Sequence, residues 1–205
     1  MSEPKDFQRA TAERIAAIFA EGKQRRVLLA DEVGLGKTIM ARQVIDKVRV
    51  LRKSVNDDMY RVVYICSNMN IVNQNIEHLG IKEKMNTSES RLSMQHLKLE
   101  EMMHKLKDEN LYGEGKMPEL LIPLTPGTSF SLTTGIGNLP ERALMYSILC
   151  EMPEFSAMKD VFYKIFKGAA NVTQKSWEWY IHSYGNRVRH CGSDYIDRMM
   201  QSLRV

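Results

Sequence analysis

The sequence predicts an α/β fold with a parallel sheet, followed by a mostly helical C-terminal segment. Three observations carry this prediction. Short apolar runs alternate with segments of helical period through the first two thirds of the chain, and a glycine-rich loop joins one such run to a helix. The last third contains helical periods only. Because strand–helix–strand alternation is typical of parallel sheets, we expect the apolar runs to lie side by side.

The α/β part begins with a helix over residues 7–20, whose larger apolar side chains are expected to face the core: Phe7, Ile15, Ile18 and Phe19. Strands are expected at 27–30, 61–66 and 120–125, and further helices at 37–51, 70–79 and 94–108. The strand at 61–66 is apolar on both faces, which predicts cover on both sides. Pro123 interrupts the last strand, which is therefore expected at a sheet edge or to end there.

Helical signals continue from residue 139 to the C-terminus. Pro140 and Glu141 are favourable residues for a first helical turn. Helices are expected at 141–151, 157–166, 173–183 and 193–203. The chain is therefore expected to consist of an α/β region at residues 1–138 and a helical insertion or extension at residues 139–205.

The composition is that of a globular chain and excludes several classes of protein. Hydrophobic residues make up 43% of the 205 residues, and no apolar run reaches the roughly 20 residues of a membrane span. The polar N-terminus is not a signal peptide. Three cysteines without Cys-x-x-Cys spacing indicate reduced thiols and a cytoplasmic location. The net charge of +4 permits binding to nucleic acid.

The segment from Asp31 to Thr38 has the properties of a phosphate-binding loop. Gly34 and Gly36 allow successive backbone N–H groups to point at phosphate oxygens. Lys37 is expected to contact the β- and γ-phosphates of ATP, and the Thr38 hydroxyl to bind Mg²⁺. The helix that begins here adds the positive end of its dipole. A chance glycine loop between a strand and a helix is the alternative.

The loop departs from the general P-loop pattern, because Asp31 stands where that pattern has glycine. In the form Asp-Glu-x-Gly-x-Gly-Lys-Thr it resembles motif I of superfamily 2 helicases, in particular the Swi/Snf-type double-stranded DNA translocases. The resemblance covers residues 5–140 and implies an incomplete RecA-like P-loop NTPase lobe that binds ATP with Mg²⁺ and acts on DNA, with double-stranded DNA favoured. The loop residues that it implies as ATP contacts are Glu32, Val33, Gly34, Leu35, Gly36, Lys37 and Thr38.

A second matching segment is the pair Phe7-Gln8, which precedes the loop along the chain. In superfamily 2 proteins a glutamine after an aromatic residue often lies here and reads the edge of adenine with its amide. The resemblance therefore implies a contact between Gln8 and ATP. An ordinary exposed helix residue is the alternative interpretation.

Two further segments resemble motifs that contact a nucleic-acid backbone. The strand at 61–66 and the polar residues after it are similar to motif Ia, which implies backbone contacts by Ser67, Asn68 and Asn70. Helix capping by Ser67 or Asn70 is the alternative. Residues 124–128 resemble the Thr-Pro-Gly element of the same family, which implies contacts by Thr125, Gly127 and Thr128; a plain turn is the alternative.

The acidic pair that the family needs for hydrolysis is not found after an apolar strand. Asp108-Glu109 follows a charged segment, and Glu151 lies in a helical one. The second lobe of the family's motor also has no room in this sequence. We therefore expect the ATP-binding portion of a helicase that does not hydrolyse ATP alone, with the missing motifs in the same or another chain.

Two other functions stay open at this stage. A small-molecule P-loop kinase would need an arginine lid, for which Arg187 and Arg189 are the only candidates. A non-catalytic module would bind DNA or a partner without turnover of ATP. The neighbouring aromatic residues could stack on nucleic acid, although their helical spacing is more typical of a core: Trp177, Trp179, Tyr180 and Tyr184. His96 and His104 are interpreted as surface histidines, because no third metal ligand is near.

Overall fold

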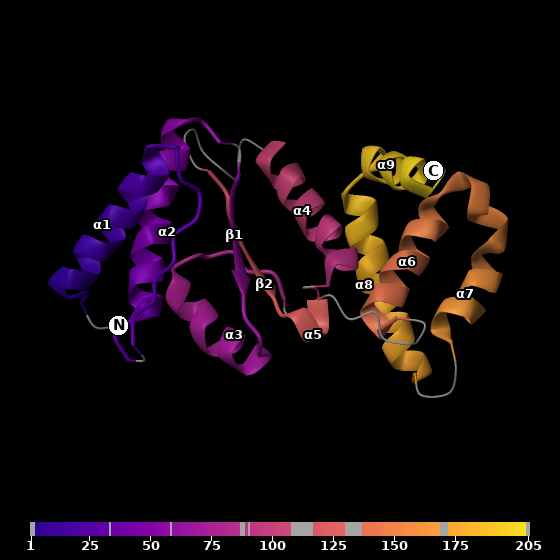
Figure 1. The fold of residues 1–205 in the computed structure, drawn as a ribbon. Helices are drawn as coiled ribbons and strands as arrows, with labels where there is room; N and C mark the ends of the chain where they lie inside the picture. The colour runs from indigo at the N-terminus through magenta and orange to yellow at the C-terminus, as the bar shows by residue number, and fades with distance from the viewer. Residues whose placement is uncertain are drawn as a thin grey trace. The chain divides into compact units, whose positions relative to one another are not determined.

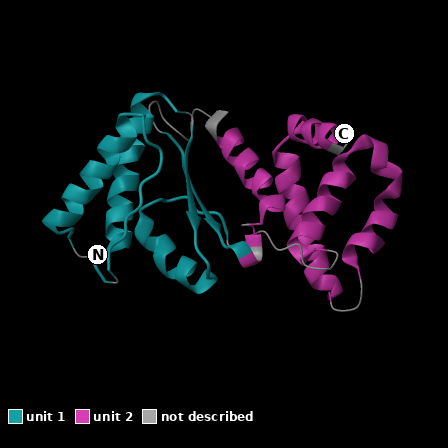
Figure 2. Cartoon of the chain, in the orientation of Figure 1, with its two compact units in different colours: residues 1–87, 114–126 teal, residues 88–113, 127–205 magenta. Residues whose placement is uncertain are grey.

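The computed structural model describes residues 3–32, 34–57, 59–86, 89, 91–107, 117–129, 137–168 and 172–203. The chain divides into two compact units, which Figure 2 distinguishes by colour. Unit 1 comprises residues 1–87 and 114–126, and unit 2 comprises residues 88–113 and 127–205. Unit 2 therefore includes residues 88–113 and 127–138 in addition to the predicted helical segment at residues 139–205.

Unit 1 contains α1 (Asp6–Ala20), α2 (Lys37–Ser54), β1 (Tyr60–Ile65), α3 (Met69–Ile76), the 3-10 helix η1 (Glu77–Leu79) and β2 (Glu119–Leu124) (Figure 1). The two strands are parallel, with Tyr60 opposite Glu119 and Ile65 opposite Leu124. This pairing confirms the parallel sheet predicted from the alternating pattern. Because α2 leads into β1 through a short connection, the start of α2 and the carboxyl end of β1 lie toward the same end of unit 1.

The strand expected at residues 27–30 is not formed, and this prediction was wrong. Among the described residues the sheet consists of β1 and β2, and Leu28 is 89% exposed. A strand is held by hydrogen bonds to a neighbouring strand. The apolar run shows that residues 27–30 suit a buried strand, but a run alone does not show whether a neighbour is present.

The prediction that β1 is covered on both faces was also wrong. Tyr60 is buried against a small core, while Val63 is 49% and Ile65 is 65% exposed. Successive strand side chains point to opposite faces, so the exposed residues share one face. The core on the other face consists of Tyr60, Val72, Ile76, Leu79, Ile81 and Leu121.

The second strand is bordered on its far side by residues 83–85. The N–H of Leu121 donates to the Glu83 carbonyl, and the N–H of Met85 donates to the Leu121 carbonyl, each at 2.9 Å. This bridge reaches only the middle of β2. Pro123, two residues further on, lies opposite Tyr64 and has no N–H to offer to the unpaired side, as expected for a proline near a strand end.

α1 packs on α2 through a face that only partly matches the expected one. Its buried residues are Gln8, Ala12 and Ala16, whereas Phe7 is 45% exposed. These three residues are spaced four apart and therefore line one side of the helix. Small side chains let two helices approach closely, and Ala12 and Ala16 are the most buried apolar residues of this helix, while Phe19 lies beside Val44 and Val48 of α2.

Unit 2 contains α4 (Leu92–Lys107), α6 (Leu139–Glu151), the 3-10 helix η3 (Pro153–Met158), α7 (Lys159–Lys167), α8 (Gln174–His190) and α9 (Ser193–Leu203), and the short α5 (Pro126–Ser129) spans the boundary. The helices predicted in this part of the chain are confirmed over their described residues, and α8 extends to His190. None of the helices that the structure describes is both long enough and apolar enough to cross a membrane.

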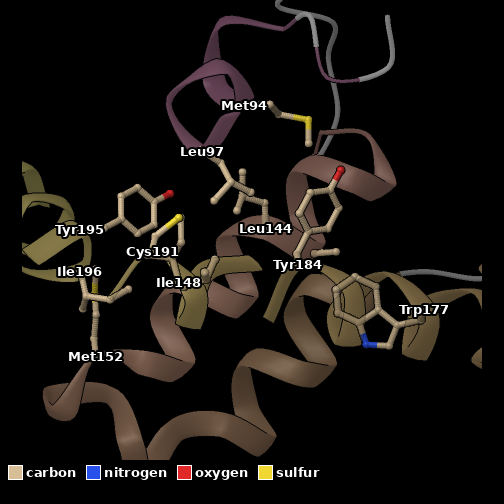
Figure 3. Packing of buried hydrophobic residues seen from close by; sticks show 12 residues of the cluster. Met94, Leu97, Leu144, Ile148, Met152, Trp177, Tyr184, Cys191, Tyr195 and Ile196 are labelled. Carbon is tan, nitrogen blue, oxygen red and sulfur yellow. The ribbon is translucent and has the colours of Figure 1, made fainter. Parts of the chain in front are cut away.

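The core of unit 2 gathers around α6 and α8 (Figure 3). Trp177 is fully buried, and its ring lies 5.8 Å from that of Tyr146 and 6.1 Å from that of Tyr163. Tyr184 is 4% exposed. The interpretation of these aromatic residues as core is therefore confirmed for Trp177 and Tyr184, but Trp179 is 64% exposed.

The first turn of α6 depends on the charge of Glu141. Burial acts to raise the pKa of this carboxyl, but hydrogen bonds from Ser93 and from the Asn138 N–H, together with the ion pair to Arg91 at 2.6 Å, lower it overall. Because the folded pKa is lowered, the stabilisation is complete above the ordinary value of 4.5 and is lost as the pH falls through the folded pKa.

Replacing Glu141 by glutamine is expected to cost about 1 kcal/mol of stability at neutral pH, because the charged bonds to Arg91 and Ser93 are lost. Urea denaturation between pH 7 and pH 3 measures this. The difference between wild type and Glu141→Gln should shrink below pH 4.5. A difference that stays constant with pH would show that the carboxyl charge contributes nothing.

Candidate nucleotide-binding site

Residues 34–36 form a turn that leads into α2. Gly34 and Gly36 have φ angles of +92° and +81°, a region that glycine enters without steric cost. Gly36 is the N-cap of α2, and its carbonyl accepts hydrogen bonds from the N–H groups of Ile39 (2.9 Å) and Met40 (3.1 Å). The first turn of α2 is anchored because Met40 is fully buried. Val33 lies outside the described residues.

Lys37 folds its side chain back over this loop. Its Nζ donates to the carbonyl oxygens of Asp31 (2.9 Å) and Glu32 (2.7 Å). Both acceptors are backbone groups, and Lys37 forms no ion pair within the described part of the chain. Its positive charge therefore has no anionic partner among these residues, and a bound phosphate group would be such a partner. Thr38 follows on the first turn of α2 and is partly buried.

Gln8 connects α1 to the loop. Its Nε2 donates to the Leu35 carbonyl and its Oε1 accepts from the Lys5 N–H, each at 2.9 Å. The side chain is only 4% exposed, so the interpretation of Gln8 as an exposed helix residue was wrong. An added Cβ on Gly36 would lie 2.5 Å from the Gln8 Nε2. Gln8 thus fixes the loop, and a contact with adenine stays a prediction.

The Gly36→Ala variant tests this packing. It is expected to lose roughly 2–3 kcal/mol of stability, because a positive φ strains alanine and the displaced Gln8 loses a hydrogen bond. Gly34→Ala is the matched control, since its φ is also positive but its Cβ would have no atom within 4 Å. Urea denaturation of both variants measures the difference. Equal losses would mean that Gln8 does not restrain the loop.

The two segments predicted to bind the nucleic-acid backbone follow the carboxyl ends of β1 and β2, at the same end of the sheet. Ile65 lies opposite Leu124, so the residues that follow the two strands begin next to each other. Ser67, Asn68 and Asn70 are exposed there. Asn68 is the N-cap of α3, and its side chain accepts a hydrogen bond of 2.8 Å from the Asn70 N–H. Capping therefore comes from Asn68, not from Ser67 or Asn70.

Thr125 is held inside unit 1 rather than presented to solvent. It is 2% exposed, and its hydroxyl donates to the sulfur of Met69 at 3.1 Å. The contact connects the end of β2 to the first residue of α3. Gly127 is exposed, and an added Cβ would meet nothing within 4 Å. The side chain of Thr128 lies outside the described residues.

Neither described strand is followed by an acidic residue. β1 leads into Cys66-Ser67-Asn68 and β2 into Thr125-Pro126-Gly127. Asp108 and Glu109 lie outside the described residues. Glu151 is the last residue of α6 and pairs with Arg189 at 2.9 Å. The part of the chain that the structure describes contains no cluster of three or more His, Cys, Asp or Glu residues suited to a metal.

The two candidate histidines differ in environment. His96 was expected at the surface but is half-buried, and its ring stacks on Tyr195 at 5.8 Å. The Tyr195 hydroxyl lies 2.9 Å from the His96 Nδ1, and burial lowers the pKa of His96. His104 lies 3.7 Å from Glu100 on the same helix. Neither geometry indicates a metal site.

Arg187 is engaged within unit 2 and is not available as a lid. Its guanidinium donates to the carboxylates of Glu89 and Glu101, and the Tyr184 hydroxyl donates to Glu89 at 3.0 Å. Burial acts to lower the pKa of Arg187, but these hydrogen bonds and charges raise it above its ordinary value. This arrangement speaks against the kinase alternative.

Sequence reasoning missed two contacts at the site, that of Thr125 with Met69 and that of Gln8 with the Leu35 carbonyl. The role of Met69 in accepting the Thr125 hydroxyl has no signal in the sequence, because it depends on how α3 meets β2. The attachment of Gln8 to the loop did have a signal. Gln8, Ala12 and Ala16 are spaced four apart, and this spacing identifies a narrow packing face.

Comparison with known proteins gives one match. The model of the family described as type III restriction enzyme, res subunit, matches residues 1–118, which is more than half of the chain. The match includes Gln8 and the whole loop at 31–38. No curated protein and no solved structure matches the sequence.

Proposed function

Because this chain belongs to the family of the type III restriction enzyme res subunit, we propose that unit 1 binds Mg²⁺·ATP through residues 31–38. The matched domain is helicase-like and of superfamily 2, which implies use of ATP and Mg²⁺ and an interaction with nucleic acid in general. The observation that carries the proposal is the Lys37 ammonium, held over a glycine loop at a helix N-terminus with no carboxylate partner among the described residues.

The residues present fit a nucleotide phosphate. Backbone N–H groups of residues 34–37 would donate to the phosphate, and the first turn of an 18-residue helix adds its dipole. Lys37 would exchange its two carbonyl acceptors for phosphate oxygens, and the Thr38 hydroxyl would hold Mg²⁺. The bound metal would offset phosphate charge. Gln8 acts in this proposal by holding Leu35 and Gly36 in position rather than by contacting phosphate. Glu32 and Val33 complete the loop as contacts inferred from the motif.

The exposed residues after β1 form the nucleic-acid side of the proposal. Ser67 and Asn70 offer short donors beside the N-terminus of α3, and a backbone phosphate is the ligand that such a group prefers. Gly127 allows close approach of a strand, and Thr128 would add a hydroxyl. Thr125 supports this edge by holding Met69. The Swi/Snf-like preference for double-stranded DNA is also part of the proposal and is supported by the Asp31-Glu32 form of the loop.

We further propose that these 205 residues bind ATP without hydrolysing it. Hydrolysis needs a carboxylate for the metal's water shell and a base for the attacking water. The carboxyl ends of β1 and β2 carry neither group. An acid-bearing strand and a second lobe would have to come from elsewhere, in the same or another chain.

Phosphate release tests this division between binding and turnover. With Mg²⁺·ATP, the protein is expected to release phosphate at the background rate, with or without duplex DNA, while a fluorescent ATP analogue binds. A DNA-stimulated rate that Lys37→Ala abolishes would refute the absence of turnover and support a complete motor. Transfer of phosphate to a small molecule, without any effect of DNA, would instead favour the kinase alternative.

A further inference from the structure

An exposed face of α8 lies between two grooves in unit 2. Trp179, His182, Asn186 and His190 follow one another at helical spacing, and Arg189 lies beside them. We call these five exposed residues the α8 ridge. From Trp179 to His190 the ridge extends for about 17 Å along the helix. The groove on one side has a volume of about 660 Å³ and the groove on the other about 410 Å³.

Trp179 is the unusual member of the ridge. Its side chain is 64% exposed, whereas Trp177, two residues earlier, is fully buried in the core (Figure 3). The Trp179 ring packs edge to face on Tyr180, with centroids 4.8 Å apart, so the indole has a rigid support. A supported, solvent-facing indole is a surface on which a nucleobase can stack.

The arginines beside the ridge are neutralised by acids, whereas two lysines in the grooves are not paired with any described residue. Arg189 is paired with Glu151, and Arg187 with both Glu89 and Glu101, so the two arginines add no net positive charge. Lys159 lines the larger groove and Lys105 the smaller one, and neither forms a hydrogen bond or ion pair within the described residues. The remaining acid on the larger groove is Glu178, which accepts a hydrogen bond from Gln174.

The floor of the larger groove is open because α8 has glycine at position 185. A glycine inside a helix costs about 1 kcal/mol relative to alanine, so its presence needs a reason. Gly185 is buried, and the nearest atom to an added Cβ would be the Arg189 Nη1 at 3.4 Å. The absent side chain leaves room beside Arg189 in the groove.

From these observations we propose that the α8 ridge binds single-stranded nucleic acid. One base stacks on Trp179, and backbone phosphates lie beside Lys159 and Lys105. The two groove lysines attract backbone phosphates, and the exposed indole selects unpaired bases over a duplex, whose bases are already stacked. This inference does not rest on the proposed nucleotide site, which lies in unit 1.

Intrinsic fluorescence tests the stacking, because the chain has only two tryptophans and one of them is buried. Binding of oligothymidylate is expected to quench the emission of Trp179 in the wild type and to leave the emission of Trp179→Phe unchanged. In anisotropy with a labelled strand, Trp179→Ala should bind roughly 5- to 100-fold more weakly, and Trp179→Phe should retain most of the affinity.

The contact between Lys159 and a backbone phosphate can be tested with a control variant on α7, the helix that carries Lys159. Lys159→Ala should weaken binding of oligothymidylate and lower the salt dependence by about one phosphate contact. Lys164→Ala removes an equal charge from an exposed position of α7 outside both grooves and should change neither. Thermal melts check that each variant folds.

Wild-type affinity in Trp179→Ala, or binding of oligothymidylate without quenching, would overturn the inference and point to contacts in unit 1 alone. Equal competition by a duplex of the same length would also overturn it. Failure of ATP to bind would contradict the proposed function and leave this result unchanged.

Discussion

Replacing Lys37 by alanine is expected to weaken binding of Mg²⁺·ATP by roughly 10- to 150-fold. The ammonium group is the one side-chain charge placed over the loop without a carboxylate partner in the described structure. Charge-assisted hydrogen bonds contribute about 1.5–3 kcal/mol each, which corresponds to this range. Titration with a fluorescent ATP analogue measures the dissociation constants.

The fold should survive this substitution, because Lys37 is exposed and its hydrogen bonds to described residues go to the loop carbonyls. Lys53→Ala provides the matched control, since it removes the same charge from the last turn of the same helix. That variant should bind ATP with nearly wild-type affinity. If Lys37→Ala and Lys53→Ala bound equally well, the loop would not be the phosphate site.

Replacing Arg187 by alanine is expected to destabilise unit 2 by roughly 2–4 kcal/mol, because removing one member of a buried ion pair leaves the other charges uncompensated. Glu89 is 8% exposed and would keep, among its described hydrogen-bond donors from α8, the Tyr184 hydroxyl. Thermal or urea unfolding, followed by circular dichroism, measures the loss.

Arg189→Ala is the control for this prediction. Arg189 pairs with Glu151 at a side-chain exposure of 54%, and exposed pairs contribute less than about 1 kcal/mol. A large loss for Arg187→Ala and a small one for Arg189→Ala would confirm that Arg187 is structural. Unchanged stability of Arg187→Ala would reopen the interpretation of this residue as a lid arginine.

The sequence predicted the helices and the parallel pairing better than it predicted burial. Periodicity and capping residues are local signals, so α6 begins where Pro140 and Glu141 indicated and α9 has the expected bounds. The prediction of a strand at 27–30 was wrong because strand formation depends on a neighbouring strand, which an apolar run does not reveal. The prediction that β1 is covered on both faces was wrong for a similar reason, because an apolar face shows what can be buried and not what covers it.

The candidate site was predicted in its motif but not in its internal contacts. The glycine loop, Lys37 and Thr38 were found because their spacing along the chain is fixed by phosphate chemistry. The burial of Thr125 could not be found this way, because it depends on the packing of α3 against β2. The four aromatic residues of α8 could also be told apart only in the structure, where Trp177 is core and Trp179 is exposed.

The most direct test of the central claim is calorimetric titration of the protein with ATP, ADP and AMP in the presence of Mg²⁺. A loop that binds phosphate through Lys37 and the N-terminus of α2 should recognise the β-phosphate. ATP and ADP are therefore expected to bind at one site, and AMP at least about tenfold more weakly. Equal binding of all three nucleotides, or binding of none, would contradict the assignment of residues 31–38 as the nucleotide site.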